Sequence, residues 1–158
     1  RSVPFSVSFW RKKKAAPTPT DFEGIFNIHD RTSSAKGGIK CVFQQAGAEA
    51  IFFSMIRPGG SSEANMLCST AGITIDSWMH IVFNVNTAIG STIEVYINGS
   101  LSGSSVLTFE HTINNFPLTF GGSHHASGYS AFTEFDQIRF FNRALTQAEV
   151  TALYNEAP

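Results

Sequence analysis

The sequence has almost no net charge and no long apolar run. Eleven Lys and Arg residues stand against twelve Asp and Glu residues, a formal net charge of −1, which argues against a protein that binds nucleic acid through general electrostatics. No stretch reaches the roughly 18 consecutive apolar residues of a membrane-spanning helix, so no membrane span is predicted. Internal repeats, zinc-binding spacings and phosphate-cradling glycine loops are also missing. What remains is 158 residues, 42% of them hydrophobic, enough for one domain with a sizeable core over 1–158.

Cysteine is scarce as well. Cys41 and Cys68 are the only two, which excludes a disulfide-rich scaffold. The pair could form one bridge or could be two small buried hydrophobic residues, and the sequence leaves both open. The chain begins at Arg1 with neither Met nor a signal peptide, so we expect a mature product or an excised piece of a longer chain.

Short segments of alternating apolar and polar residues are present throughout. Residues 5–9, 79–85 and 92–97 alternate in this way, which is typical of half-buried strands. Turn signals separate such segments about every eight to twelve residues. Among these signals, Asn98-Gly99 favours a two-residue hairpin turn with positive φ at both positions. About ten short strands predict an all-β fold, a two-sheet antiparallel β-sandwich.

The last quarter of the chain, residues 132–154, predicts a core strand followed by one short C-terminal helix. Phenylalanines fall on both parities of this strand, so either both of its faces are covered or a bulge shifts the register. Thr146 and Glu149 have the spacing of a capping box, and Leu145 and Val150 that of a hydrophobic staple. Because a helix of two or three turns is not stable alone, it must dock on the sandwich.

Three stretches resemble laminin-G-like domains of the concanavalin A-like lectin and glucanase superfamily, whose jelly rolls include the pentraxins. They are FSVSFW at 5–10, WMHIVF at 78–83 with IEVYING at 93–99, and DQIRFFNRALTQAEVTALY at 136–154. The resemblance implies a concanavalin A-like jelly roll closed by the C-terminal helix. It also implies that Trp10 and Trp78, which lie in stretches matching the core of the family, are buried.

The function that the resemblance implies is non-catalytic glycan binding in a cell-surface recognition module. The module would belong to a longer extracellular, cell-surface or virion-surface protein. Its partners would be a glycan or glycosylated surface and other domains of that chain, and a homo-oligomer of the module is left open. The alternative is a structural or decoration domain that contacts proteins and has no sugar site. A glucanase-like glycoside hydrolase ranks below both, because a fold alone does not fix an activity.

The pair Glu134 and Asp136 decides against the hydrolase. Some glucanases of this fold carry three carboxylates on one strand, and two of them act as nucleophile and general acid. Here Ile138 and Arg139 occupy the places where the last Glu should stand. A lone pair lacks the full geometry, so the sequence predicts a protein that is not an enzyme.

Candidate binding residues come from the predicted loops, where recognition commonly resides. They are Arg57 in a Pro-Gly-Gly turn, and His124, His125 and Tyr129 in a polar loop. Relatives of the family bind Ca²⁺ through oxygen ligands, and Asp136 is the side chain that the resemblance favours for it. The loop around His124 is not acidic as in pentraxins, which argues against a site of that type.

The run Arg11-Lys-Lys-Lys14 admits two interpretations. It could bind sulfated or carboxylated sugars or lipid headgroups, or it could be a solvated strand end. We favour the solvated end because the total charge is near zero. His80 falls within a predicted strand, where a hydrogen-bonded structural role is expected.

Overall fold

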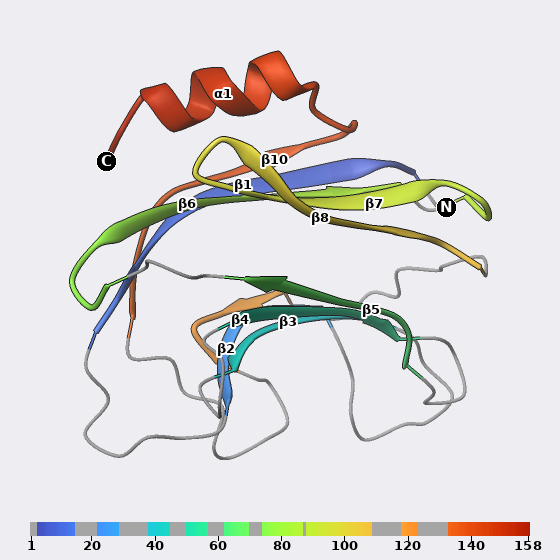
Figure 1. Ribbon diagram of the computed structural model, residues 1–158, viewed down its shortest axis with the longest axis horizontal. Helices are drawn as coiled ribbons and strands as arrows, with labels where there is room; N and C mark the ends of the chain where they lie inside the picture. Colours follow the sequence, from blue (N-terminus) through green and yellow to red (C-terminus); the bar gives the residue numbers. More distant parts are fainter. Residues whose placement is uncertain are drawn as a thin grey trace.

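The computed structural model describes residues 3–14, 22–28, 38–44, 50–56, 62–69, 74–86, 88–108, 118–122 and 133–158. These residues form two antiparallel five-stranded sheets with one helix packed on the outside, which confirms the predicted jelly-roll sandwich (Figure 1). The elements are β1 (Phe5–Lys13), β2 (Phe22–Ile28), β3 (Gly38–Gln44), β4 (Ala50–Ile56), β5 (Ser62–Ser69), β6 (Trp78–Val85), β7 (Thr92–Ile97), β8 (Ser100–Val106), β9 (Thr119–Phe120), β10 (Thr133–Phe141) and α1 (Gln147–Asn155).

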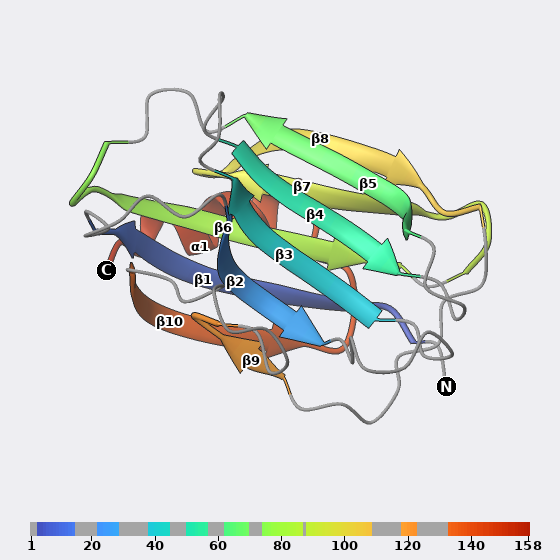
Figure 2. The same ribbon diagram turned by 90° about the horizontal axis from the view of Figure 1, so that it is seen from below.

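The chain passes between the two sheets several times. Sheet A has the strand order β10-β1-β6-β7-β8, and sheet B has the order β5-β4-β3-β2-β9. Figure 2 shows sheet B lying across the inner face of sheet A. Strand β5 contacts β8, and Phe120 of β9 contacts Phe135 of β10 between the two sheets. Strand β1 sits in sheet A between β10 and β6, and residues 6–8 and 10–12 pair with both neighbouring strands.

The core lies between the sheets and is rich in aromatic rings. Phe9 of β1 contacts Phe83, Phe120 and Phe135, with ring centroids 5.5–6.0 Å apart. Such tilted and edge-on arrangements are favoured by the ring quadrupole. The core residues of β1 and β6 alternate with outward-facing ones, as the sequence predicted.

Strand β10 contains the bulge that the sequence left open. Its register against β1 shifts between Ser8, which pairs with Arg139, and Trp10, which pairs with Asp136. Gln137 within this interval has φ of 48°, a left-handed conformation typical of bulge residues. The extra residue explains the mixed parity, because Phe135 packs in the core whereas Phe141 packs under the helix.

The closing helix begins as predicted. The Thr146 hydroxyl accepts from the Glu149 amide, and the Glu149 carboxylate accepts from the Thr146 amide, which completes the capping box. Arg143 donates two hydrogen bonds to the same carboxylate. Leu145 and Val150 are both buried in one apolar cluster on the outer face of sheet A, as the staple requires. The pKa of Glu149 is lowered to about 2, first by Arg143 and then by the Thr146 backbone.

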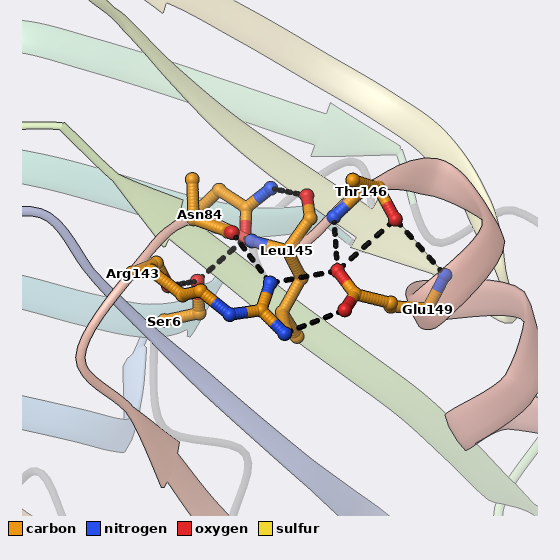
Figure 3. A network of polar contacts seen from close by, with 7 residues as sticks. Ser6, Asn84, Arg143, Leu145, Thr146 and Glu149 are labelled. Carbon is orange, nitrogen blue, oxygen red and sulfur yellow. Dashed lines mark hydrogen bonds and ion pairs between the residues drawn. The ribbon is translucent and has the colours of Figure 1, made fainter.

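A buried amide ties this helix to the sheet (Figure 3). Asn84 Oδ1 accepts from the Leu145 amide at 3.1 Å, and Asn84 Nδ2 donates to the Leu145 carbonyl at 2.8 Å. The Ser6 hydroxyl lies 2.7 Å from both Asn84 Oδ1 and the Arg143 carbonyl oxygen. The segment leading into α1 is therefore held by side chains of β1 and β6, which is why so short a helix can persist.

The two cysteines are buried and free. Cys41 lies on β3 opposite Phe53, and Cys68 lies on β5 opposite Ile51, so strand β4 separates them. Two inter-strand spacings of about 4.8 Å already exceed the Cα separation that a disulfide allows. Of the two possibilities left by the sequence, the structure shows buried hydrophobic residues, and burial raises the pKa of both thiols.

Candidate binding surface

Helix α1 covers only part of the outer face of sheet A. It packs over Val82 and Tyr96, and its last turn ends with Tyr154 above Trp10. Strand β1 is antiparallel to both of its neighbours, so its end lies beside the starts of β10 and β6. There, beyond the end of the helix, Lys12 stands between Glu134 on one side and Trp78 on the other.

These residues belong to a group that we call the rim cluster: Lys12, Lys14, Asp76, Trp78 and Glu134. The Lys12 ammonium lies 5.3 Å from the centroid of the half-buried Trp78 ring and 3.3 Å from a Glu134 oxygen. Lys14 bridges two carboxylates, at 2.6 Å from Asp76 and 2.9 Å from Glu134. The cluster thus places one indole among two ammonium groups and two carboxylates on an open part of the surface.

Backbone geometry sets the position of Asp76. Its amide donates to the Lys13 carbonyl at 2.8 Å, and its φ of 65° turns the chain toward β1 just before β6 begins. Left-handed φ is tolerated by Asp better than by most residues. The Asp76 carboxylate then meets Lys14, a residue 62 positions away in sequence.

The charges within the rim cluster stabilise one another. The pKa of Glu134 is lowered by hydrogen bonds from Lys14 and Lys12, and the pKa of Asp76 is lowered by the hydrogen bond from Lys14. The pKa of Lys14 is raised by the same two carboxylates, Asp76 first. Glu134, Asp76 and Lys14 are therefore ionised near neutral pH. Two positive and two negative charges sum to zero over the cluster.

Three rings, those of Trp10, His80 and Tyr154, pack together at the end of the helix, next to the rim cluster. Tyr154 stacks on Trp10 at 5.7 Å between ring centroids, and His80 lies 5.1 Å from Trp10. His80 is buried, and its Nε2 is 2.9 Å from the Ser8 hydroxyl, which confirms its structural role. Burial lowers the pKa of His80 to about 4.

The basic run is not the solvated strand end that the sequence favoured. Arg11 and Lys13 point inward and are buried, with the guanidinium carbon 4.7 Å and the ammonium nitrogen 4.4 Å from the centroid of Phe43. Only Lys12 and Lys14 face outward, where both form ion pairs. Side chains alternate between the faces of a strand, and Arg11 and Lys13 share the parity of the core residue Phe9.

The indole of Trp78 also departs from the expectation. Trp10 is buried as predicted, at 5% exposure, but Trp78 is only half-buried. Trp78 has the parity of His80 and lies on the outer face, whereas Met79 and Ile81 point into the core. The alternation within β6 could have revealed this, because it assigns position 78 to the face opposite the core.

Glu134 and Asp136 share one face of β10, as the alternation predicted, and both are exposed. Asp136 accepts a hydrogen bond from the Gln137 amide at 2.7 Å. The β10 bulge brings Arg139, not Ile138, onto this face, where it forms an ion pair with Glu156. Where a third carboxylate would stand, the strand carries a cation.

The structure does not describe the four candidate residues from the predicted loops. Arg57, His124, His125 and Tyr129 lie outside the described residues. By sequence, the segment 123–132 leads directly into Thr133, the first residue of β10, which precedes Glu134 of the rim cluster. Within the described ranges, no group of three or more His, Cys, Asp and Glu side chains could hold a metal ion.

Comparison with known families identifies the superfamily of the chain. A laminin-G family model, described as concanavalin A-like lectin/glucanases superfamily, matches residues 1–151. The chain belongs to this superfamily. The match covers the first two stretches from which the resemblance was drawn and the third as far as residue 151, and it includes all five residues of the rim cluster. No curated protein matches the chain.

Solved structures give the same fold at low identity. The binding domain of Paraclostridial Mosquitocidal Protein 1 is 22% identical, with a TM-score of 0.71 over 98% of this chain and 37% of its own. The receptor binding domain of botulinum neurotoxin D is 16% identical, with a TM-score of 0.75 over 98% of this chain and 37% of its own. A heptameric SAP-like pentraxin from Limulus polyphemus is 16% identical, with a TM-score of 0.70 over 97% of this chain and 70% of its own.

These similarities show a concanavalin A-like, lectin-like fold. The chain spans little more than a third of the two toxin binding domains, so only their fold is shared with it here. None of the helical segments among the described residues is long and apolar enough to cross a membrane.

Proposed function

We propose that this protein is a non-catalytic recognition module that binds a glycan at the rim cluster. The observation that carries the proposal is the half-buried indole of Trp78 set among two ammonium groups and two carboxylates on a part of sheet A that the helix leaves open. Membership of a lectin superfamily, and the similarity to two toxin binding domains and a pentraxin, support it at the level of the fold.

The chemistry of the rim cluster suits a sugar. The apolar C–H face of a pyranose packs on an aromatic ring, and its hydroxyls both donate and accept hydrogen bonds. Around Trp78, Lys12 and Lys14 offer donors, while Glu134 and Asp76 offer acceptors. A few convergent polar groups that fix orientation, beside an apolar surface that supplies burial, are what small-ligand sites generally contain.

Electrostatics disfavour glycoside hydrolysis at the same carboxylates. A general acid for this reaction needs a raised pKa so that it stays protonated near neutral pH. The two lysines instead lower the pKa of Glu134, and Arg139 stands where the third carboxylate of the glucanase pattern would lie. Glu134 is therefore suited to accept hydrogen bonds and not to donate a proton.

A glycan array followed by titration calorimetry tests the proposal. Trp78→Ala should weaken binding about tenfold, because about 60 Å² of apolar surface at about 25 cal/mol per Å² is worth about 1.5 kcal/mol. Trp78→Phe keeps a ring and should retain most of the affinity. Leu101→Ala changes an exposed apolar residue of β8, at the far edge of sheet A, and serves as the control. Absence of glycan binding by the wild type, or binding indifferent to Trp78→Ala, would exclude this site.

A second function, protein contact without a sugar site, is favoured by an apolar group beside β9, at the opposite end of β10 from Glu134. Phe140 is 53% and Leu118 38% exposed, and both lie near Phe120, whose ring centroid is 6.3 Å from that of Phe140. Sedimentation measurements on the wild type and on Phe140→Ser test it. An oligomer that dissociates in the variant, together with silence on the glycan array, would favour a decoration role.

The loop and metal candidates complete the proposal. Arg57, His124, His125 and Tyr129 would extend the contact with the glycan, and Asp136 would contribute to a Ca²⁺ site. Calcium titration of the wild type and of Asp136→Asn by calorimetry tests the ion, and alanine variants of the four loop residues on the same array test the extension. The setting we propose is an extracellular or virion-surface protein in which this module is one part of a longer chain.

A further inference from the structure

The charge pattern of the rim cluster points to the class of glycan, and this inference rests on the function proposed above. We propose that the rim cluster selects a neutral pyranose and rejects sulfated or carboxylated sugars. Sites for anionic sugars present ammonium or guanidinium groups that are available to the ligand. Here Lys12 of β1 and Lys14, the residue after the strand, are already engaged with carboxylates at 2.6–3.3 Å.

An arriving anion would meet as much repulsion as attraction. A sulfate close to Lys14 would also be close to Asp76 and Glu134, which lie 2.6 Å and 2.9 Å from the same nitrogen. Displacing either carboxylate would leave it without its charge partner, and the hydrogen bonds from these lysines lower the pKa of both Asp76 and Glu134. Asp136, exposed two residues along β10, adds one more negative charge nearby.

A neutral hydroxyl faces no such opposition. It can accept from a lysine N–H that remains free to donate, since each ammonium has three, and it can donate to a carboxylate oxygen beside it. The four charges stay paired while the sugar ring packs on Trp78. Binding of this kind depends little on ionic strength, because no net charge is neutralised when the complex forms.

The inference is tested by comparing neutral and anionic sugars on the wild-type protein. We expect glucose-, galactose- or N-acetylglucosamine-terminated oligosaccharides to bind, with an affinity that changes less than twofold between 50 and 300 mM NaCl. Sulfated heparin oligosaccharides and sialylated glycans should show no binding that depends on Trp78. Wild-type binding to sulfated or sialylated glycans alone, lost in Trp78→Ala, would overturn the neutral class and leave the proposed function standing. Silence towards every glycan would overturn both.

A paired substitution provides the converse test. Asp76→Asn with Glu134→Gln releases Lys12 and Lys14 and changes the charge of the rim cluster from zero to +2. This variant should gain at least tenfold affinity for the sulfated oligosaccharide and should show a steep loss of that affinity with salt. Asp136→Asn removes a negative charge of the same strand without freeing either lysine, and it should gain far less. Equal gains in the two variants would show that overall charge, and not the paired lysines, sets the selectivity, and would refute the inference.

Discussion

Replacing Asn84 should release the C-terminal helix from the sandwich. The side chain is 3% exposed, and both of its polar atoms bond to the backbone of Leu145. Asn84→Leu keeps the volume of the side chain but removes these bonds. The Leu145 amide and carbonyl would then be buried without their partner, while Ser6 would keep its contact with the Arg143 carbonyl at 2.7 Å.

The cost follows from those two backbone groups. A buried polar group left unsatisfied costs about 1–3 kcal/mol, so the pair should cost about 2–6 kcal/mol. This is a large share of the roughly 5–15 kcal/mol that holds a typical domain folded. For a chain of this length each kcal/mol shifts the melting temperature by about 2–4 °C, so we expect a fall of about 4–24 °C.

Calorimetric unfolding measures the loss, and hydrogen exchange shows where it occurs. The amides of residues 147–155 should exchange faster in Asn84→Leu, while those of β3 and β4 change less. Asn142→Leu makes the same substitution at an exposed position just before the helix and should leave both measurements near the wild-type values. A melting temperature within 2 °C of the wild type, with unchanged exchange in α1, would refute the view that this amide anchors the helix.

Three further predictions follow from single groups. The pKa of His80 is about 4 in the folded protein, below its ordinary value of about 6.5. The contribution of His80 to stability is therefore fully present above about pH 6.5 and is lost as the pH falls toward 4, a loss of less than about 3 kcal/mol. The His80→Gln variant should not show this loss when unfolding is measured as a function of pH. Gly99 has φ of 79°, and a Cβ there would lie 3.0 Å from the Tyr154 ring, so Gly99→Ala should lower the free energy of unfolding by about 1–2 kcal/mol in a denaturant titration. Gly90 has the same φ but open space around it, so Gly90→Ala serves as the control. An equal loss in both variants would show that backbone strain acts alone, without the contact with Tyr154. Because burial raises the pKa of both thiols, iodoacetamide should label Cys41 and Cys68 only after unfolding, and the mass should then rise by two adducts. A single adduct would reveal a blocked thiol. Rapid labelling of the native protein would show that the thiols are accessible.

Much of the fold could be predicted because its signals are local. The Thr146 and Glu149 capping box and the Asn98-Gly99 turn each follow from side-chain and backbone chemistry within four residues, and the structure has both, with φ of 49° and 79° in the turn. The family resemblance then identified the sandwich as a concanavalin A-like jelly roll, but neither it nor any local signal gave the order of the strands in each sheet. The β10 bulge was recognised as one of two possibilities, because parity alone does not locate the extra residue.

The candidate surface was harder to predict because it depends on which residues face each other across strands. Lys12, Trp78 and Glu134 come from three strands, and nothing in their separate sequences places them side by side. The parity of Arg11 and Lys13 did carry a signal, since both continue the series of Val7 and Phe9. Basic runs are usually solvated, and the prediction of a solvated strand end followed that rule instead of the parity. Burial over an aromatic ring nevertheless makes inward-facing cations tolerable.

The outer residues of β1 link the two halves of the sheet face. Ser6 and Ser8 lie under the helix, Trp10 lies at its end, and Lys12 lies in the rim cluster. The contacts of Lys12 are set by strand pairing and not by α1, so the rim should keep its geometry when the helix end is disturbed. Tyr154→Ala should therefore shift tryptophan fluorescence to longer wavelength as Trp10 becomes exposed, while sugar affinity at Trp78 stays within twofold. If affinity fell together with the fluorescence shift, the end of the helix would have to be counted as part of the binding surface.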